Sequence, residues 1–274
     1  MGVGIAYVFA VAGFETYVVE PASAQIAIAR ATIERAAEDG VRRGKLDSAG
    51  VAASTERLHF VVATDTLPRG LDLIIESVPE RIELKQAVIA EIERLSPKAI
   101  ATNTSALSIS KLAESVSRPD TFIGMHFFNP VWSLALVELV RGICTNDETV
   151  AHCQDLVERI DKQSIVVHDS PGFATSRLDL IASIEAMRMV QDGVASAADI
   201  DRAMVVAYRH PTGPLRLSDI VGLDVRLDIA RNLAHELGER FAPPRILEEL
   251  VAAGHLGVKS GRGFFDWSEP PING

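Results

Sequence analysis

The chain has 274 residues, of which 47% are hydrophobic, so it is long enough for one large domain or two modest ones around a buried core. Its formal net charge of −10, with no Lys/Arg cluster longer than that at residues 41–45, argues against nucleic acid as a partner. No apolar run reaches the roughly 20 residues of a membrane span, and neither the two cysteines nor the seven histidines form a ligand pattern, so we expect a cytoplasmic protein without membrane contact, disulfides or a bound metal.

The start of the chain predicts a helix, a strand and a second helix. Small and apolar residues recur at helical spacing from Gly2 to Gly13, and the β-branched run from Thr16 to Val19 predicts a strand that leads to the acid Glu20. The amphipathic segment from Gln25 to Arg43 then predicts a long helix.

From residue 58 to residue 167, apolar runs typical of strands alternate with helical stretches. The predicted strands are Leu58–Val62, Leu71–Glu76, Ala99–Asn103, Phe122–Phe128, Leu136–Val140 and Ser164–Val167, and the predicted helices are Arg81–Leu95 and a short one from Ser108. This alternation is typical of an α/β fold with a doubly wound, mostly parallel sheet covered on both faces, which is the architecture of Rossmann-like domains.

A turn-forming segment, Asp169 to Gly172, marks a change of pattern. Beyond it the sequence has helical periods and no strand until its end. The predicted helices are Phe173–Asp192, Ala197–Tyr208, Leu215–Leu237 and Pro244–Ala253, followed by a glycine-rich tail from Gly257 to Gly263. We therefore predict a Rossmann-like domain over residues 1–169 and an all-helical C-terminal domain over residues 170–274.

Part of a dinucleotide-binding motif lies at the start of the chain. In that motif a strand runs into Gly-x-Gly-x-x-Gly at a helix N-terminus, and an acid about 20 residues later binds the ribose. Gly2 fits the third glycine and Glu20 the acid, which favours NAD over NADP because a carboxylate repels a 2′-phosphate. The first strand and two glycines would precede Met1, so we expect the natural chain to be longer. The alternative is a small-residue helix on a sheet with an acid at its edge.

Three polar features follow one another in the middle of the chain: Asn103-Thr104-Ser105, His126 and Glu138. A base that takes a proton from an alcohol while a hydride leaves its carbon needs a neutral, oriented imidazole, and a carboxylate on the other ring nitrogen provides this. Glu138, in an otherwise apolar predicted strand, is such a carboxylate for His126. The alternatives are a histidine satisfied within the core and a glutamate exposed on the strand.

At these residues the sequence resembles the L-3-hydroxyacyl-CoA dehydrogenase family, and the resemblance runs the whole length. It rests on Asn103-Thr104-Ser105, Gly124-Met125-His126-Phe127-Phe128-Asn129-Pro130, Leu136-Val137-Glu138, Asp169-Ser170-Pro171-Gly172-Phe173, Asp199-Ile200-Asp201, His210-Pro211-Thr212-Gly213-Pro214, Gly222-Leu223-Asp224 and Lys259-Ser260-Gly261-Arg262-Gly263-Phe264. The resemblance implies an enzyme that uses NAD as cofactor and dimerises through its helical domain, so we expect a homodimer.

The resemblance also implies roles for single residues. It identifies His126 as the catalytic base, Glu138 as its partner and Ser105 as the serine that bonds the substrate oxygen. The implied cofactor contacts are Gly2, Glu20, Glu80, Lys85 and Asn103. The candidate substrate contacts are Ser176, Asn129, Trp132 and Arg209.

The chain departs from the family pattern at four positions that concern the substrate. Ser176 replaces an asparagine that helps to hold the substrate carbonyl, and Asp39 replaces a lysine often found near the CoA phosphates. Trp132 and Ala135 replace a proline and a lysine, which alters the expected acyl tunnel. Losing cations weakens binding of a polyanion, whereas a guanidinium such as that of Arg209 suits a free carboxylate.

We therefore expect a small carboxylate-bearing alcohol or hydrated aldehyde as the substrate, for example a pyridine carboxylate of vitamin B6 degradation. The alternative is an L-3-hydroxyacyl-CoA dehydrogenase, such as a 3-hydroxybutyryl-CoA dehydrogenase, which would use the same mechanism. A third possibility is a non-catalytic, crystallin-like member of the family. The set of His126, Glu138 and Ser105 argues against it, since nothing structural requires all three.

Overall fold

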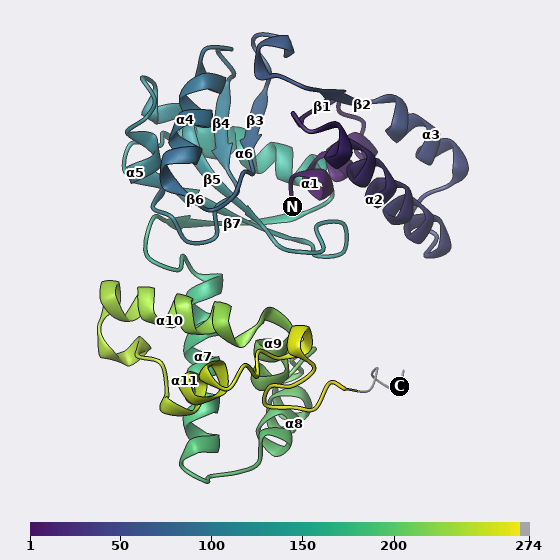
Figure 1. The fold of residues 1–274 in the computed structure, drawn as a ribbon. Coiled ribbons are helices and arrows are strands. Elements are labelled where there is room, and N and C mark those ends of the chain that lie inside the picture. Colours follow the sequence, from purple (N-terminus) through teal and green to yellow (C-terminus); the bar gives the residue numbers. More distant parts are fainter. Residues whose placement is uncertain (269–274) are drawn as a thin grey trace. The chain divides into compact units, whose positions relative to one another are not determined.

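The computed structural model describes residues 1–268, and the chain divides into two compact units that meet at Ser170 and Pro171 (Figure 1). The first unit combines helices with a mostly parallel sheet and the second is helical, which confirms the predicted fold class. Within residues 1–268, no helix is both long and apolar enough to cross a membrane.

In the first unit, a five-stranded sheet lies beside a two-stranded one. Its helices and strands are α1 (Gly2–Val11), β1 (Thr16–Val19), α2 (Ser23–Arg42), α3 (Ser48–Glu56), β2 (Leu58–Val61), β3 (Leu73–Glu76), α4 (Ile82–Glu93), β4 (Ala99–Thr102), α5 (Ile109–Ala113), β5 (Phe122–Phe127), β6 (Leu136–Arg141), α6 (Asp147–Arg159) and β7 (Gln163–His168). The larger sheet has the order β3-β4-β5-β6-β7, in which only β5 and β6 pair antiparallel. Strands β1 and β2 pair in parallel as a separate sheet.

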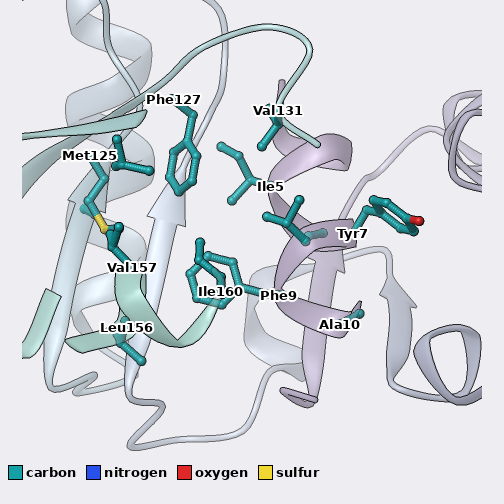
Figure 2. Packing of buried hydrophobic residues seen from close by; sticks show 14 of the residues in the cluster. Ile5, Tyr7, Phe9, Ala10, Met125, Phe127, Val131, Leu156, Val157 and Ile160 are labelled. Atoms are coloured by element: carbon teal, nitrogen blue, oxygen red, sulfur yellow. The ribbon is translucent and has the colours of Figure 1, made fainter. Parts of the chain in front are cut away.

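Residues of the central strands β4, β5 and β6 alternate between two covered faces. One face, which includes Ala101, Met125 and Leu139, joins a buried apolar cluster with α1 and α6, and Figure 2 shows side chains of α1, β5 and α6 meeting there. Helices α4 and α5 contact the strands on the other side. There Gly124 allows a close approach of α5, because a Cβ built on Gly124 would lie 2.8 Å from Ile109 Cδ1.

The second unit packs its helices around two buried apolar clusters. Its helices are α7 (Thr175–Gln191), α8 (Ala197–Tyr208), α9 (Pro214–Val221), α10 (Leu223–Leu237) and α11 (Arg245–Ala252). One cluster includes Met187 and Leu227, and the other includes Leu180 and Leu233. Both clusters take residues from α7 and α10, so these two helices form the centre of the unit.

Asp219, on α9, anchors the glycine-rich tail. Its buried carboxylate accepts hydrogen bonds from the main-chain N–H groups of Phe264 (3.0 Å) and Phe265 (2.9 Å) and from the indole of Trp267 (2.8 Å). Gly263 passes so close that a Cβ built on it would lie 2.1 Å from Asp219 Oδ1. The predicted tail, Gly257–Gly263, thus leads at Gly263 into a segment that is bound to α9.

The structure differs from the predicted elements at three helices. The sequence patterns do not predict α3 or α6, although Asn146 caps α6 by accepting a hydrogen bond from the Thr149 N–H at 2.7 Å. The single helix predicted over Leu215–Leu237 is two helices, α9 and α10. It is interrupted because Gly222 has a φ of 106°, outside the helical range.

Candidate active site

His126 and Glu138 face each other across the antiparallel pair of β5 and β6. The register pairs the two residues directly, so their side chains lie on the same face of the sheet. His126 Nδ1 and Glu138 Oε2 are 3.0 Å apart, which is a hydrogen-bond distance. His126 is 7% exposed and Glu138 is 0% exposed. Strand register thus builds a buried imidazole–carboxylate contact.

The burial of Glu138 determines what this contact can do. A carboxylate in the protein interior interacts more strongly with a charge on a neighbouring imidazole than it would in water. Glu138 therefore fixes the orientation of the His126 ring. The Phe128 ring covers part of the site, with its centroid 4.4 Å from that of His126.

Asn103 and Ser105 follow the carboxyl end of β4. The Asn103 side-chain oxygen accepts a hydrogen bond from the main-chain N–H of Phe127 at 2.9 Å, next to His126 in the chain. Ser105 is exposed, and its main-chain N–H donates to Glu80 Oε1 at 3.1 Å. Asn103 is therefore fixed to β5, and the Ser105 loop is held by a carboxylate that precedes α4.

Residues expected at the cofactor lie near the carboxyl ends of strands. Glu20 directly follows β1, and its carboxylate accepts a hydrogen bond from the N–H of Ala22 at 2.9 Å. Gly2 begins α1 close to the end of β3, since a Cβ built on it would lie 3.4 Å from Ser77 Cβ. A helix N-terminus, an acid and bare backbone in this place are the groups that bind the phosphates and ribose of a dinucleotide. These residues therefore fit NAD.

Lys85, which is expected to contact the cofactor, has a buried side chain. Its side chain is 1% exposed, and its ammonium donates to Glu76 Oε1 at 2.9 Å and to the main-chain oxygen of Val78 at 3.1 Å. The direct contact expected between Lys85 and the cofactor stays a prediction, and in the structure the Lys85 ammonium faces Glu76 and Glu80. Glu76 is a partner that the sequence analysis misses, and its only signal is an acid at the end of the apolar run Leu71–Glu76.

Two of the expected substrate contacts, Asn129 and Trp132, lie on the loop between β5 and β6 and have different surroundings. Asn129 is exposed and precedes Pro130 in a cis peptide bond. Trp132 packs against the apolar cluster, where its ring meets the Tyr7 ring of α1 edge-on with 6.4 Å between centroids. Trp132 thus packs against α1, while its expected contact with the substrate stays a prediction.

Ser176 and Arg209 belong to the second unit. Ser176 lies in the first turn of α7, and Arg209 is the exposed residue that ends α8 in a left-handed conformation with φ of 60°. Asp39, in the first unit, forms ion pairs with Arg42 and, at 2.9 Å, with Arg43. The Asp39 charge is thus balanced by its own helix and the residue that follows it, which weakens its expected effect on CoA phosphates.

Comparisons with known proteins cover nearly the whole chain. A family model described as "3-hydroxyacyl-CoA dehydrogenase, NAD binding domain" matches residues 1–170, and one described as "3-hydroxyacyl-CoA dehydrogenase, C-terminal domain" matches residues 172–267. The chain is 39% identical to a 3-hydroxybutyryl-CoA dehydrogenase of Mycobacterium tuberculosis over an alignment of 272 residues. This alignment covers 97% of this chain and 95% of the relative. It is 36% identical to a probable 3-hydroxybutyryl-CoA dehydrogenase of Bacillus subtilis, over 98% and 94% of the two chains.

The crystal structure of an (S)-3-hydroxybutyryl-CoA dehydrogenase from Ralstonia eutropha is similar to this chain with a TM-score of 0.93 and 38% identity, covering 98% and 96% of the two chains. A solved NAD-dependent dehydrogenase of a pyridine carboxylic acid is less similar, with a TM-score of 0.77 and 32% identity over 98% and 88%. The expectation of a free carboxylate substrate, such as a vitamin B6 intermediate, is therefore wrong, and the role expected for Arg209 as its partner is withdrawn with it.

Proposed function

The chain belongs to the 3-hydroxyacyl-CoA dehydrogenase family of NAD-dependent oxidoreductases, and from this premise we propose that it interconverts a short-chain L-3-hydroxyacyl-CoA, such as 3-hydroxybutyryl-CoA, and the matching 3-oxoacyl-CoA. The observation that carries the proposal is the buried contact of His126 with Glu138. Such a pair is what proton transfer to or from an alcohol requires.

In the oxidation, His126 Nε2 takes the proton of the 3-hydroxyl group while hydride leaves C3. NAD, held by Gly2, Glu20, Glu80 and Asn103, would supply the hydride acceptor, so that the products would be the 3-oxoacyl-CoA, NADH and a proton. Glu138 stabilises the positive charge that develops on the His126 ring, which lowers the barrier in both directions. Reduction uses the same atoms in reverse, with the His126 imidazolium as the acid.

Seven further residues are proposed to position the reactants. Ser105 and Asn129, both exposed near the dyad strands, offer a hydroxyl and an amide to the substrate oxygens, and Ser176 of α7 offers a second hydroxyl to the thioester carbonyl. Asn103, next to the Ser105 loop, is proposed as a cofactor contact together with Gly2, Glu20 and Glu80. This division leaves the proton chemistry to His126 alone.

The test is the reduction of acetoacetyl-CoA by NADH, followed through the loss of NADH absorbance. We expect a kcat/KM of about 10⁴ M⁻¹s⁻¹ or more, as is usual for an enzyme on its own substrate, and much lower values with free acetoacetate. The His126→Gln variant is the matched control, because it should still bind NADH while losing turnover. A folded protein that binds NADH and leaves acetoacetyl-CoA unchanged would contradict the proposal.

We also propose that the enzyme works in the cytoplasm as a homodimer. Helices α8, α9 and α10 carry exposed apolar side chains that suit contact with a second copy, namely Val205, Val206, Ile220, Val221 and Val225. Both cysteines are free, as is usual in a reducing compartment. Light scattering that returns the mass of one chain at micromolar concentration would contradict the dimer, and cell fractionation tests the compartment.

A further inference from the structure

Glu76 is a buried acid with an unusual set of contacts. It is the last residue of β3 and is 3% exposed. Its carboxylate accepts hydrogen bonds from the Thr102 hydroxyl at 2.7 Å and from the Val78 N–H at 2.5 Å, and it receives the Lys85 ammonium at 2.9 and 3.1 Å. Thr102 is its direct neighbour in the β3/β4 register. The carboxylate is therefore fixed from both strands and from α4.

Lys85 connects Glu76 to Glu80, which lies nearer the surface. Its ammonium has three protons, and the groups around it are the Glu76 carboxylate, the Val78 carbonyl oxygen at 3.1 Å and Glu80 Oε2 at 3.3 Å. A buried ammonium of this kind is stable only while its charge is balanced. Glu76 is fully enclosed and Glu80 is not, so Glu76 is the group that holds Lys85 inside the protein.

Glu80 connects Lys85 to the Ser105 loop. Its side chain is 38% exposed, so in the absence of a partner it would be a mobile surface group. Its other oxygen, Oε1, accepts hydrogen bonds from the Thr104 hydroxyl, from the Ser105 N–H at 3.1 Å and from the Ala106 N–H at 3.3 Å. One continuous series of charged contacts thus runs from Glu76 through Lys85 and Glu80 to the main chain of Ser105.

We propose that Glu76 is a positioning residue of the reaction, which fixes the Ser105 loop through Lys85 and Glu80 without touching a reactant itself. The proposal rests on the proposed function, in which Ser105 binds the substrate oxygen. A displacement of about 1 Å at a substrate-binding group is enough to lower turnover about a hundredfold, so loosening this series changes catalysis and not only stability. The role expected for Lys85 as a cofactor contact becomes an indirect one.

The experiment compares Glu76→Gln, Glu80→Gln and the double variant in the full-length protein, with acetoacetyl-CoA and NADH as substrates. We expect each single variant to lower kcat by about ten- to a hundredfold at saturating NADH. We expect the double variant to be no slower than the slower single one, because both changes break the same series. Turnover is read at a temperature at which circular dichroism shows every variant folded.

Two further variants separate positioning from stability. Thr102→Val removes one hydrogen bond to Glu76 while nearly keeping the side-chain volume. It therefore tests the proposal even if Glu76→Gln does not fold, and we expect its kcat to fall as well. Glu93→Gln is the matched control, because Glu93 also lies on α4 and accepts main-chain N–H bonds, at 2.8 and 2.9 Å, but from Ser117 and Arg118 near the other end of the helix. Its kcat should stay within about twofold of the parent.

If the wild-type protein is active, three results would overturn the proposal. The first is an unchanged kcat in folded Glu76→Gln, or in Thr102→Val if Glu76→Gln does not fold. The second is a loss in the double variant that equals the product of the two single losses, and the third is an equal loss of kcat in Glu93→Gln. A wild-type protein that does not reduce acetoacetyl-CoA would instead refute the proposed function, so the two failures are distinguishable. NADH binding by each variant, measured by fluorescence, shows whether a loss lies in cofactor affinity.

Discussion

His126 and Glu138 could be predicted as a pair because the sequence shows both features: a histidine at the end of a predicted strand and an acid inside an apolar run. The contact at 3.0 Å fits that prediction, while their catalytic roles stay predictions. Lys85 and Trp132 could not be placed in the same way. The sequence does not show whether a lysine or a tryptophan points into the protein, because the residues that contact it there come from other elements. These residues are Glu76 for Lys85 and Tyr7 for Trp132.

Replacement of Glu138 by Gln tests the dyad at this scale. An amide keeps the shape and one hydrogen bond but removes the charge that stabilises the imidazolium, so we expect kcat to fall about a hundredfold or more with little change in KM. Steady-state kinetics with acetoacetyl-CoA and NADH measure both constants, and thermal unfolding followed by circular dichroism checks the fold. A kcat within twofold of the wild type refutes the role of Glu138.

The two cysteines should differ sharply in reactivity. Burial raises the pKa of the Cys153 thiol to about 12, so almost no thiolate forms near neutral pH, whereas Cys144 is exposed. We expect iodoacetamide to modify the native protein once, at Cys144, and the urea-unfolded protein twice, as read by mass spectrometry. Equal labelling of Cys153 in the native protein would show that α6 opens readily.

Strands and helices were predictable to different degrees, for physical reasons. Strands such as β3 and β4 are largely apolar runs, so their positions follow from composition within one or two residues. Helix α6 is half polar, and its apolar positions, Val150, Cys153 and Val157, become meaningful only once the sheet they cover is known. The break between α9 and α10 depends on a single glycine conformation, which periodicity does not reveal.

The packing of α5 on β5 provides a prediction about elements. In Gly124→Ala the new methyl group would lie 2.8 Å from both Ile109 Cδ1 and Val140 Cβ, so we expect unfolding to become easier by about 1–3 kcal/mol. Ile109→Val removes the Cδ1 atom and alone should cost about 1 kcal/mol. Denaturant unfolding of the double variant should give a loss smaller than the sum. Strictly additive losses would mean that the α5 contact is not what limits the residue at position 124.

At the scale of the whole molecule, each unit has its own buried clusters, and the C-terminal unit closes on itself through Asp219. A buried carboxylate that accepts three N–H bonds is costly to alter, because an amide in its place presents N–H donors to other N–H donors. The glycine-rich tail therefore belongs to the folded second unit, and its stability reports on that unit.

Asp219→Asn should loosen this tail without affecting the first unit. We expect a loss of about 1–3 kcal/mol of stability and faster tryptic cleavage after Arg262, which is exposed within the tail. Asp228→Asn, at an exposed position of α10, is the control and should leave cleavage unchanged. If both variants are cleaved at the wild-type rate, the tail is held by its apolar contacts alone.

The register of β5 and β6 also has a consequence for the loop between them. Ladder hydrogen bonds in the strands, and not the loop between them, set His126 opposite Glu138. A change within residues 128–135 therefore leaves this register intact, whereas a shift of one residue within either strand would send the two side chains to opposite faces. Substitutions such as Trp132 and Ala135 can therefore change the contacts that the loop makes without moving His126 and Glu138 out of register.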